Sequence, residues 1–553
     1  MRQPAQNQWD AIVVGSGLGG LSCAAYLCAA GKRTLVLEAH YVAGGNSQIF
    51  RRNRKGREYE FDVGIHYIGE CAPDGLIPAI LRGAGLAERV AFRQLDGDGF
   101  DTLVFPDFTF RVPKGWDRYR SRLLETFPEE AGSIGTVVDI LRRVADEGAR
   151  VTDGDVAMQE MASEAPTFAE WGLRPVPDLF REHGLSERAS AVLLAESLAY
   201  ACPPSRTPVA LQGWLLNHYV GGGAYYPEGG AQMIAGRLVE AIRAYGGEVR
   251  TEARVERIHI EKGRAAGVTL ENGERIDAPS VVSNADLKRT MLELVEPGHL
   301  AADTLGRVRG YRMALPLFVV YLGLDIDVVN EGIENTNYHV WGTYDVEQVY
   351  RRLQAGEMPK ESMAYATFTS VKDPTNPRLA PEGYTNLQIM TVAPPDYAYW
   401  KMDGKTPSQG ARYRRDPAYR SHKKQLTEQL IDSVERVLPA IRDHIDWKEA
   451  ATPIAQERFT RSCGGTSYGI ELACDQIGSM RMGPETEVPG LFLSGASGPS
   501  GHGIANAMRS GVLAAGAALD TDLLPMIRSG EVIGDSSKLP ELRDDWDAWQ
   551  ECH

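Results

Sequence analysis

The sequence predicts an α/β fold, α+β overall, in which a parallel-sheet domain carries an inserted domain of mixed sheet and helix. The first observation is an apolar run at 11–14, followed by a glycine-rich turn at 15–20 and a helix-forming stretch at 21–30. A second apolar run at 34–37 comes next, and this order predicts a Rossmann-type βαβ unit. The second observation is length, because 553 residues exceed what one hydrophobic core usually supports.

The glycines of the turn have mechanical roles in a dinucleotide site. Gly15 permits a tight turn, Gly17 lets the backbone approach a pyrophosphate, and Gly20 allows close contact between helix and strand. Gly19 belongs to the same turn, and the helix that follows offers free N–H groups and a partial positive charge to the diphosphate. Glu38 ends the second strand, where its carboxylate can accept hydrogen bonds from ribose hydroxyls.

The residues after Glu38 distinguish FAD from NAD. The chain continues Ala39-His-Tyr-Val-Ala-Gly44-Gly45-Asn46-Ser47. An acid followed by a glycine pair resembles the extended FAD motif of the amine oxidase and phytoene desaturase superfamily, where the glycine pair lets the backbone pass close to the cofactor. No second GxGxxG follows a strand, which argues against a separate NAD(P)H domain. The sequence therefore predicts FAD as the cofactor.

Three later segments extend the resemblance. The stretch at 61–69 looks like the corresponding segment of retinol saturases and plant-type carotenoid isomerases. The order of elements at 226–285 is similar to the middle part of phytoene desaturase relatives, where Val255 would lie near the adenine. The segment 490–504 resembles the closing flavin motif of bacterial phytoene desaturases. The resemblance covers about a third of the chain and implies these cofactor-binding residues: Gly15, Gly17, Gly19, Gly20, Glu38, Ala39, Gly44, Gly45, Asn46, Ser47, Val255, Gly495, Gly503 and Ile504.

Two positions depart from the family pattern. Retinol saturases often carry cysteines where this chain has Asn46 and Ser47, and His502 occupies a position that is usually small in carotene desaturases. A carotenoid substrate therefore does not follow directly from the resemblance.

The motifs predict a discontinuous FAD-binding domain made of 1–90, 218–300 and 455–525. The segments 91–217 and 301–454 would then build the substrate domain, the first mainly helical and the second opening with a strand at 315–324. The last residues, from about 526 to 553, form an acidic tail that docks a partner, packs on its own surface or is mobile.

Composition excludes some classes of protein. The formal net charge is −15, from 59 basic and 74 acidic residues, so a nucleic-acid partner is not expected. No apolar stretch approaches the length of a membrane span, and residues 1–10 lack the apolar core of a signal peptide. The seven cysteines have no metal-ligand spacing, so no metal site is predicted. We expect a cytoplasmic protein, with contact at a membrane surface left open.

The predicted chemistry is hydride transfer between a substrate carbon and flavin N5, with a proton moving at the adjacent carbon. His502 is the first candidate for acid, base or substrate orientation, because its loop should face the flavin ring. His66 is the second candidate and Tyr468 the third, each with a bracing or packing role as the alternative. Ser500 lies near the ring on the same logic but lacks the strand–Ser–helix elbow of a hydrolase.

The apolar content of the inserted segments predicts a hydrophobic small-molecule substrate, isoprenoid or alicyclic. Desaturation, saturation and double-bond isomerisation all fit this chemistry, and oxygen and quinones are the candidate electron partners. Two alternatives remain: an oxygen-dependent amine or alcohol oxidase, and a non-enzymatic prenyl-binding protein of the GDP-dissociation-inhibitor type. The intact glycines and Glu38 argue against the second alternative.

Overall fold

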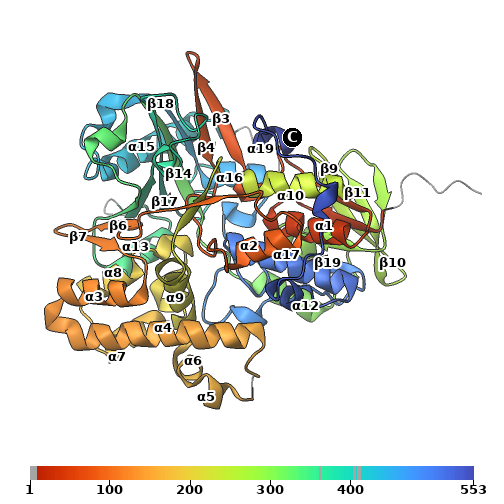
Figure 1. Cartoon of the computed structure of the whole chain (residues 1–553), viewed down its shortest axis with the longest axis horizontal. Coiled ribbons are helices and arrows are strands. Elements are labelled where there is room, and N and C mark those ends of the chain that lie inside the picture. The colour runs from red at the N-terminus through yellow and green to blue at the C-terminus, as the bar shows by residue number, and fades with distance from the viewer. Residues whose placement is uncertain (1–8, 158, 360–362, 403–406, 408–412) are drawn as a thin grey trace, which may run out of the picture.

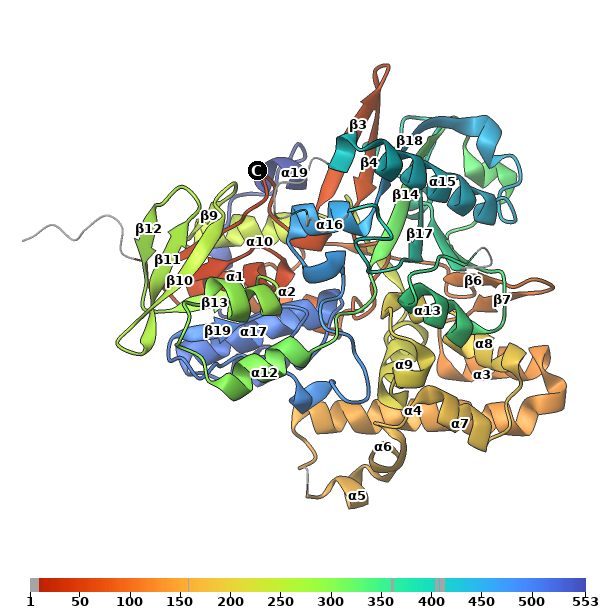
Figure 2. The ribbon, with the colours of Figure 1, turned by 180° about the vertical axis from the view of Figure 1, so that it is seen from behind.

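The computed structural model describes residues 9–157, 159–359, 363–402, 407 and 413–553. Two sheets lie apart in the molecule, each with its own covering elements, and a layer of helices extends beneath the second sheet (Figures 1 and 2). The half that contains the N-terminal glycine turn is called the dinucleotide lobe below, and the half that contains the second sheet is called the sheet lobe. The predicted α/β fold is confirmed.

The dinucleotide lobe is built on a parallel five-stranded sheet. Its strand order is β19 (Leu491–Leu493), β13 (Val281–Ser283), β1 (Ala11–Val14), β2 (Thr34–Leu37) and β9 (Glu248–Arg250). Strands from three distant parts of the chain therefore pair side by side. On one side β1 pairs with β2, which begins at residue 34, and on the other side it pairs with β13, which begins at residue 281.

Both faces of this sheet are covered, because alternate side chains of each strand point to opposite faces. Val13, Val36 and Val282 pack against a layer of helices. Ile12 and Leu35 point the other way, into a cluster with a small antiparallel sheet. The helices are α1 (Leu18–Ala29), α10 (Met233–Ala244) and α17 (Ile504–Leu519), and the small sheet is β10 (Val255–Glu261), β11 (Arg264–Leu270) and β12 (Arg275–Asp277).

Helices α1 and α17 approach each other very closely. A Cβ atom on Gly511 of α17 would lie 2.2 Å from the Gly19 carbonyl oxygen and 2.9 Å from the Ser22 Cβ. Only glycine fits at such a distance. The contact holds the start of α17 beside the start of α1, although nearly the whole chain separates them in sequence.

The sheet lobe contains a seven-stranded sheet. The order is β18 (Ile445–Ala451), β14 (Leu317–Leu324), β17 (Thr385–Val392), β16 (Met363–Thr367), β15 (Asn337–Trp341), β6 (Asp101–Val104) and β7 (Thr109–Val112). All neighbours pair antiparallel except β15 and β6. Phe318 and Val320 of β14 face a cluster with α15 (Pro417–Val434), while Val319 and Tyr321 face the opposite side.

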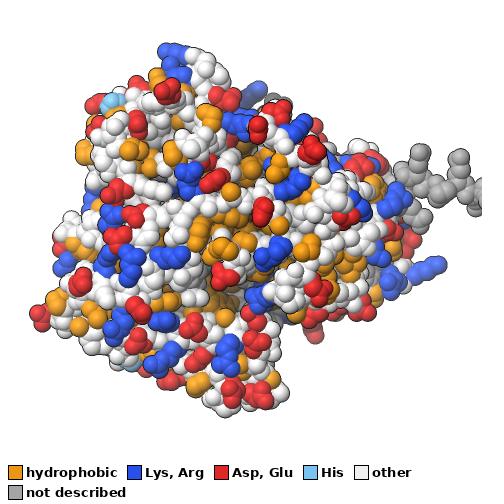
Figure 3. Space-filling model, viewed as in Figure 1, with side chains coloured by type: hydrophobic (Ala, Val, Ile, Leu, Met, Phe, Trp, Pro, Cys, Tyr) orange, Lys and Arg blue, Asp and Glu red, His pale blue; other side chains and the backbone are white. Residues whose placement is uncertain are grey.

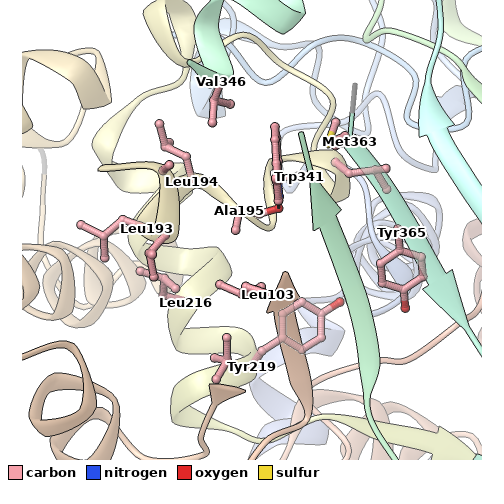
Figure 4. Packing of buried hydrophobic residues seen from close by; sticks show 14 of the residues in the cluster. Leu103, Leu193, Leu194, Ala195, Leu216, Tyr219, Trp341, Val346, Met363 and Tyr365 are labelled. Carbon is pink, nitrogen blue, oxygen red and sulfur yellow. Dashed lines mark hydrogen bonds between the residues drawn. The ribbon is translucent and has the colours of Figure 1, made fainter. Parts of the chain in front are cut away.

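The segment between β7 and the end of α9 is helical, as the sequence predicts for this insert. Its long helix α4 ends at Asp153 and is followed by Gly154 in the left-handed conformation, a common helix stop. The layer consists of α3 (Trp116–Thr126), α4 (Ala131–Asp153), α5 (Met161–Glu164), α6 (Pro166–Trp171), α7 (Val176–Glu182), α8 (Glu187–Leu194) and α9 (Val209–Leu216). Its apolar faces pack under the seven-stranded sheet, where Leu193, Leu194 and Leu216 meet Leu103 and Trp341 (Figure 4).

The remaining elements connect or cover the lobes. They are β3 (Ile49–Arg54), β4 (Arg57–Asp62), α2 (Leu76–Gly83), β5 (Phe92–Gln94), β8 (Tyr225–Pro227), α11 (Leu287–Arg289), α12 (Ala302–Gly310), α13 (Val346–Gln354), α14 (Thr369–Lys372), α16 (Pro453–Thr460), α18 (Leu523–Arg528) and α19 (Ala548–Glu551). The expected domain borders stay a prediction, and two of these elements pack across them. The Val308 side chain of α12 packs with Leu287 and Leu493 of the dinucleotide lobe, and Tyr59 of β4 packs in the core of the sheet lobe.

The acidic C-terminal tail packs on its own chain. Arg51 makes a bidentate ion pair with Asp547 at 2.8 and 2.9 Å. The Arg237 guanidinium lies 3.6 Å from the centre of the Trp546 ring. The Ala43 N–H donates to the Cys552 carbonyl oxygen at 2.8 Å, which anchors the tail next to the glycine pair.

The surface carries interspersed charge, with acidic and basic side chains mixed over the face shown in Figure 3. Among the described residues, no helix combines the length and the apolar character that a membrane crossing requires.

We expect Gly511→Ala to destabilise the protein by about 1–3 kcal/mol, because the new methyl group overpacks the contact between α1 and α17. Gly306→Ala in α12 is the matched control, since nothing lies within 4 Å of its would-be Cβ and alanine favours a helix. Urea unfolding of the FAD-loaded proteins measures both. Equal stability of Gly511→Ala and the wild type would contradict the close contact.

Candidate active site

A cavity of about 630 Å³ extends from the dinucleotide lobe to the sheet lobe. One end is lined by the glycine turn and by residues from the ends of β2, β10 and β13. The other end is lined by side chains from β14, β15, β16 and β17. A volume of this size is typical of ligand and cofactor sites.

The structure brings nearly all the predicted site residues together in the wall of this cavity. The lining includes Gly15, Gly17, Gly19, Glu38, Ala39, Gly44, Gly45, Asn46, Ser47, Val255, Gly495, Gly503 and Ile504, together with His66, Tyr468 and His502. Gly20 is the exception, because it lies in the contact between helix and strand. A Cβ there would be 2.2 Å from the Gly15 carbonyl oxygen.

The two glycine segments near the N-terminus lie against each other. The Gly44 N–H donates to the Ser16 carbonyl oxygen at 3.1 Å, and Gly17 and Gly44 form an isolated parallel bridge. Gly45 has a φ of 58°, and a Cβ there would lie 3.0 Å from the Gly17 Cα. Both the backbone conformation and the close approach therefore require glycine at position 45.

The Glu38 carboxylate is held in place at the end of β2. Its Oε2 accepts hydrogen bonds from the Ser16 N–H at 2.8 Å and from the Ser16 hydroxyl at 2.6 Å. Its Oε1 accepts from the His40 N–H at 2.8 Å. The carboxylate lines the cavity with a fixed orientation, which suits it to accept hydrogen bonds from the hydroxyls of a ribose.

Asn284 is a site residue that the sequence analysis missed. Its side chain fills the space between the two glycine turns: a Cβ on Gly17 would meet its Nδ2 at 2.8 Å, and a Cβ on Gly19 or Gly495 would meet its Oδ1 at 2.6 or 2.7 Å. The available signal was its place directly after β13, since the carboxyl ends of neighbouring parallel strands meet at one edge of the sheet.

His502 is buried in the loop before α17. Burial and the nearby Arg481 guanidinium lower the pKa of His502 to about 3. Arg481 is itself buried and donates to the carbonyl oxygens of Ile470 (2.6 Å) and Gly498 (3.1 Å). The His502 imidazole is therefore neutral near pH 7, which favours the orienting role over that of a charged acid.

The other two candidates are also restrained. The Tyr468 hydroxyl donates to the Leu198 carbonyl oxygen at 2.8 Å, and its ring lies 4.8 Å from that of His502. Burial, and then Lys372, lower the pKa of His66 to about 3, so this imidazole is also neutral near pH 7. Each candidate contacts the cavity, and neither is poised as a cationic acid.

A polar group of side chains at the sheet-lobe end was not predicted either. Tyr67 donates to the buried Asp101 carboxylate at 3.0 Å, and the Asn337 amide donates to the same carboxylate at 2.7 Å. The Lys372 ammonium donates to the His66 carbonyl oxygen at 2.6 Å and, because of its burial, has its pKa lowered to about 7. Tyr67 lies between β4 and α2, and the other three residues come from β6, β15 and α14, so no local motif could have shown that they meet.

The cavity fits FAD. Glycine backbones line its first end, where a side chain would fill the space, and the N-termini of α1 and α17 both reach its wall. Such helix ends stabilise a diphosphate and negative charge on a flavin. Among the described residues, no three His, Cys, Asp or Glu side chains are grouped to hold a metal ion.

Fold and site together define an FAD-dependent oxidoreductase. The chain belongs to the family of flavin containing amine oxidoreductases, whose model matches residues 18–519.

Comparison with individual proteins gives a consistent result. The chain is 27% identical to the human (Homo sapiens) all-trans-retinol 13,14-reductase over 521 residues, which covers 88% of this chain and 82% of that protein. It is 26% identical to the chloroplastic prolycopene isomerase of Arabidopsis thaliana over 542 residues, covering 93% and 83%. Cyclohexylamine oxidase from Brevibacterium oxydans has a similar fold, with a TM-score of 0.58 and 16% identity over 93% of this chain and 99% of that one.

We expect Glu38→Gln to weaken FAD binding by about 10- to 100-fold, because hydrogen bonds to a charged acceptor contribute about 1.5–3 kcal/mol. Fluorescence titration of the apoprotein with FAD measures the change. Glu531→Gln on the exposed tail is the control and should bind FAD like the wild type. Equal affinity of Glu38→Gln and the wild type would contradict the role given to this carboxylate.

The lowered pKa of His502 predicts that the free energy of unfolding depends on pH. Its folded-state pKa of about 3 lies below the unfolded value of 6.5, so the unfolded chain binds the proton first as the pH falls. The stability from this group is complete above pH 6.5 and is lost as the pH falls toward 3, with about 2 kcal/mol lost at pH 5. Urea unfolding at pH 7.5 and pH 5 should therefore show a smaller loss for His502→Asn than for the wild type. An identical loss in both proteins would argue against a neutral buried His502.

Proposed function

We propose that this protein acts on carbon–carbon double bonds of a hydrophobic, isoprenoid-like substrate, by hydride transfer at flavin N5. The observation that carries the proposal is the apolar far end of the cavity, whose walls include Leu317, Val319 and Met390. This end is continuous with the loop 495–503, which is expected to face the flavin ring. Two relatives along most of the chain are a retinol reductase and a carotenoid isomerase by name, and both names describe chemistry at polyene double bonds.

The distribution of charge favours this substrate over an amine. The carboxylates in the cavity wall are Glu38, Glu256, Asp286 and Glu293, and all of them belong to the dinucleotide lobe. Among the described residues, none of the side chains from β14 to β17 that line the far end is acidic. A cationic amine would find no counter-ion there, whereas a polyene needs none.

We expect the FAD-loaded protein, after anaerobic reduction of its flavin with dithionite, to regain the yellow spectrum of oxidised flavin when all-trans-retinol is added. The product should be heavier than retinol by two hydrogen atoms. Prolycopene should be isomerised by the reduced protein without return of the oxidised spectrum. Conversion of either polyene supports the proposal, and free reduced FAD is the control.

An amine-oxidising enzyme would behave differently. Cyclohexylamine or putrescine would then bleach the oxidised protein anaerobically and release hydrogen peroxide in air, while both polyenes left the flavin and themselves unchanged. That result would overturn the proposal. A purified protein that binds no flavin at all would overturn it as well.

A further inference from the structure

The far wall of the cavity contains several tyrosines, and Tyr219 differs from the rest. It lies in a π-helical turn, Asn217–Gly221, directly after α9, and its side chain is 8% exposed at the cavity wall. Figure 4 shows its hydroxyl pointing toward the region where the hydroxyl end of Tyr365 also lies. Single π turns within helices occur frequently at functional sites because they redirect side chains.

Two of the neighbouring tyrosines already use their hydroxyl protons. The Tyr67 hydroxyl donates to Asp101 at 3.0 Å, and the Tyr468 hydroxyl donates to the Leu198 carbonyl oxygen at 2.8 Å. The Tyr365 hydroxyl has no hydrogen-bond partner among the described residues, but it is fully buried. The Tyr219 hydroxyl donates to no group among the described residues, so its proton is available to a molecule in the cavity.

Tyr219 is also held rigidly. Its ring stacks on the Tyr67 ring, with centroids 4.4 Å apart and an angle of 29° between the planes. Tyr67 is fixed in turn by Asp101, which is fully buried and receives a second hydrogen bond from Asn337. A donor must be positioned within a few tenths of an ångström to be effective, and this supporting layer provides that precision.

The surroundings keep Tyr219 protonated. Burial is the main cause that raises the pKa of Tyr219 well above its usual range, and the carboxyl groups of Asp101 and Glu196 add to it. Burial and Asp101 also raise the pKa of Glu196, so this carboxyl group tends to hold a proton of its own. A phenol in such a site remains neutral near pH 7.

We propose that Tyr219 is the catalytic proton donor when this enzyme reduces a double bond of its substrate. This inference rests on the function proposed above and adds the residue that donates the proton. The donor residue is one that none of the sequence motifs contains.

The step balances as follows. A reduced flavin held in the cavity would supply a hydride to one carbon of the substrate double bond and would itself be oxidised by two electrons. The π bond breaks, and the neighbouring carbon receives the proton of the Tyr219 hydroxyl as the O–H bond breaks. The product has gained two hydrogen atoms, and the phenolate takes a proton from water that enters when the product leaves.

The acidity of a buried phenol is sufficient for this step. The carbanion that forms when a polyene accepts a hydride is far more basic than a phenolate, so even a weakly acidic phenol can protonate it.

The test uses the FAD-loaded protein, reduced anaerobically with dithionite and mixed with all-trans-retinol in a stopped-flow instrument. We expect Tyr219→Phe to slow reoxidation of the flavin by about 100-fold or more, since general acid catalysis typically contributes factors of 10²–10⁴. Retinol binding, followed by fluorescence quenching, and the melting temperature should stay at the wild-type values. The matched control is Tyr399→Phe, because this tyrosine lies outside the cavity, where its ring contacts His422 of α15; it should reoxidise at the wild-type rate.

The outcomes that overturn the inference are distinct. Reoxidation of Tyr219→Phe within about threefold of the wild-type rate, or an equal loss in Tyr399→Phe, would exclude Tyr219 as the donor. If Tyr219→Phe loses its flavin or its stability, 3-fluorotyrosine at position 219 keeps the shape and makes the phenol more acidic. The step should then become faster, and an unchanged rate would overturn the proposal.

Failure of the proposed function is seen in the wild-type protein, and failure of the role of Tyr219 is seen only in the variants. A wild-type protein that transfers no hydride to retinol overturns the reductive direction before any variant is compared. Isomerisation of prolycopene without retinol reduction would leave the proposed function standing and remove the role of Tyr219 as the acid of a reduction.

Discussion

The cavity depends on the contact between helices α1 and α17, where Gly511 meets the backbone of Gly19 at a distance that no side chain permits. The two helices start next to each other, so the turn at 15–20 and the turn at 495–503 become walls of the same cavity. Asn284 fills the space between them at the end of β13. One helix pair therefore unites a cofactor site whose halves lie nearly 500 residues apart.

The second wall follows from the way the sheet lobe is built. One face of β14 is packed against α15, and the opposite face, with Val319 and Tyr321, lines the cavity. The alternation of side chains along a strand thus divides one segment between core and site. The helical layer beneath the sheet closes the space and brings Leu198 and Tyr219 to the same wall.

Burial determines the chemistry available at this junction. It keeps the imidazoles of His66 and His502 neutral, and it keeps the phenol of Tyr219 protonated. The cavity thus offers neutral donors and apolar surface at its far end, and the carboxylates that line it all belong to the dinucleotide lobe. This combination matches a neutral polyene and the addition of a hydride and a proton, rather than the binding of a cationic amine.

The sequence by itself determined the parts of the molecule whose physics is local. A strand, a glycine turn, a helix N-terminus and an acid at this spacing form a diphosphate and ribose site from one short segment, so Gly15, Gly17 and Glu38 could be placed from their spacing. The glycine pair and the C-terminal turn then indicated FAD and the family. The tertiary structure alone decided which distant residues meet: Asn284 between the two turns, Asp101 beneath Tyr67, and Tyr219 with a free hydroxyl. These contacts arise from strand pairing and helix packing across hundreds of residues, and the pKa values that govern the chemistry depend on the burial that such packing creates.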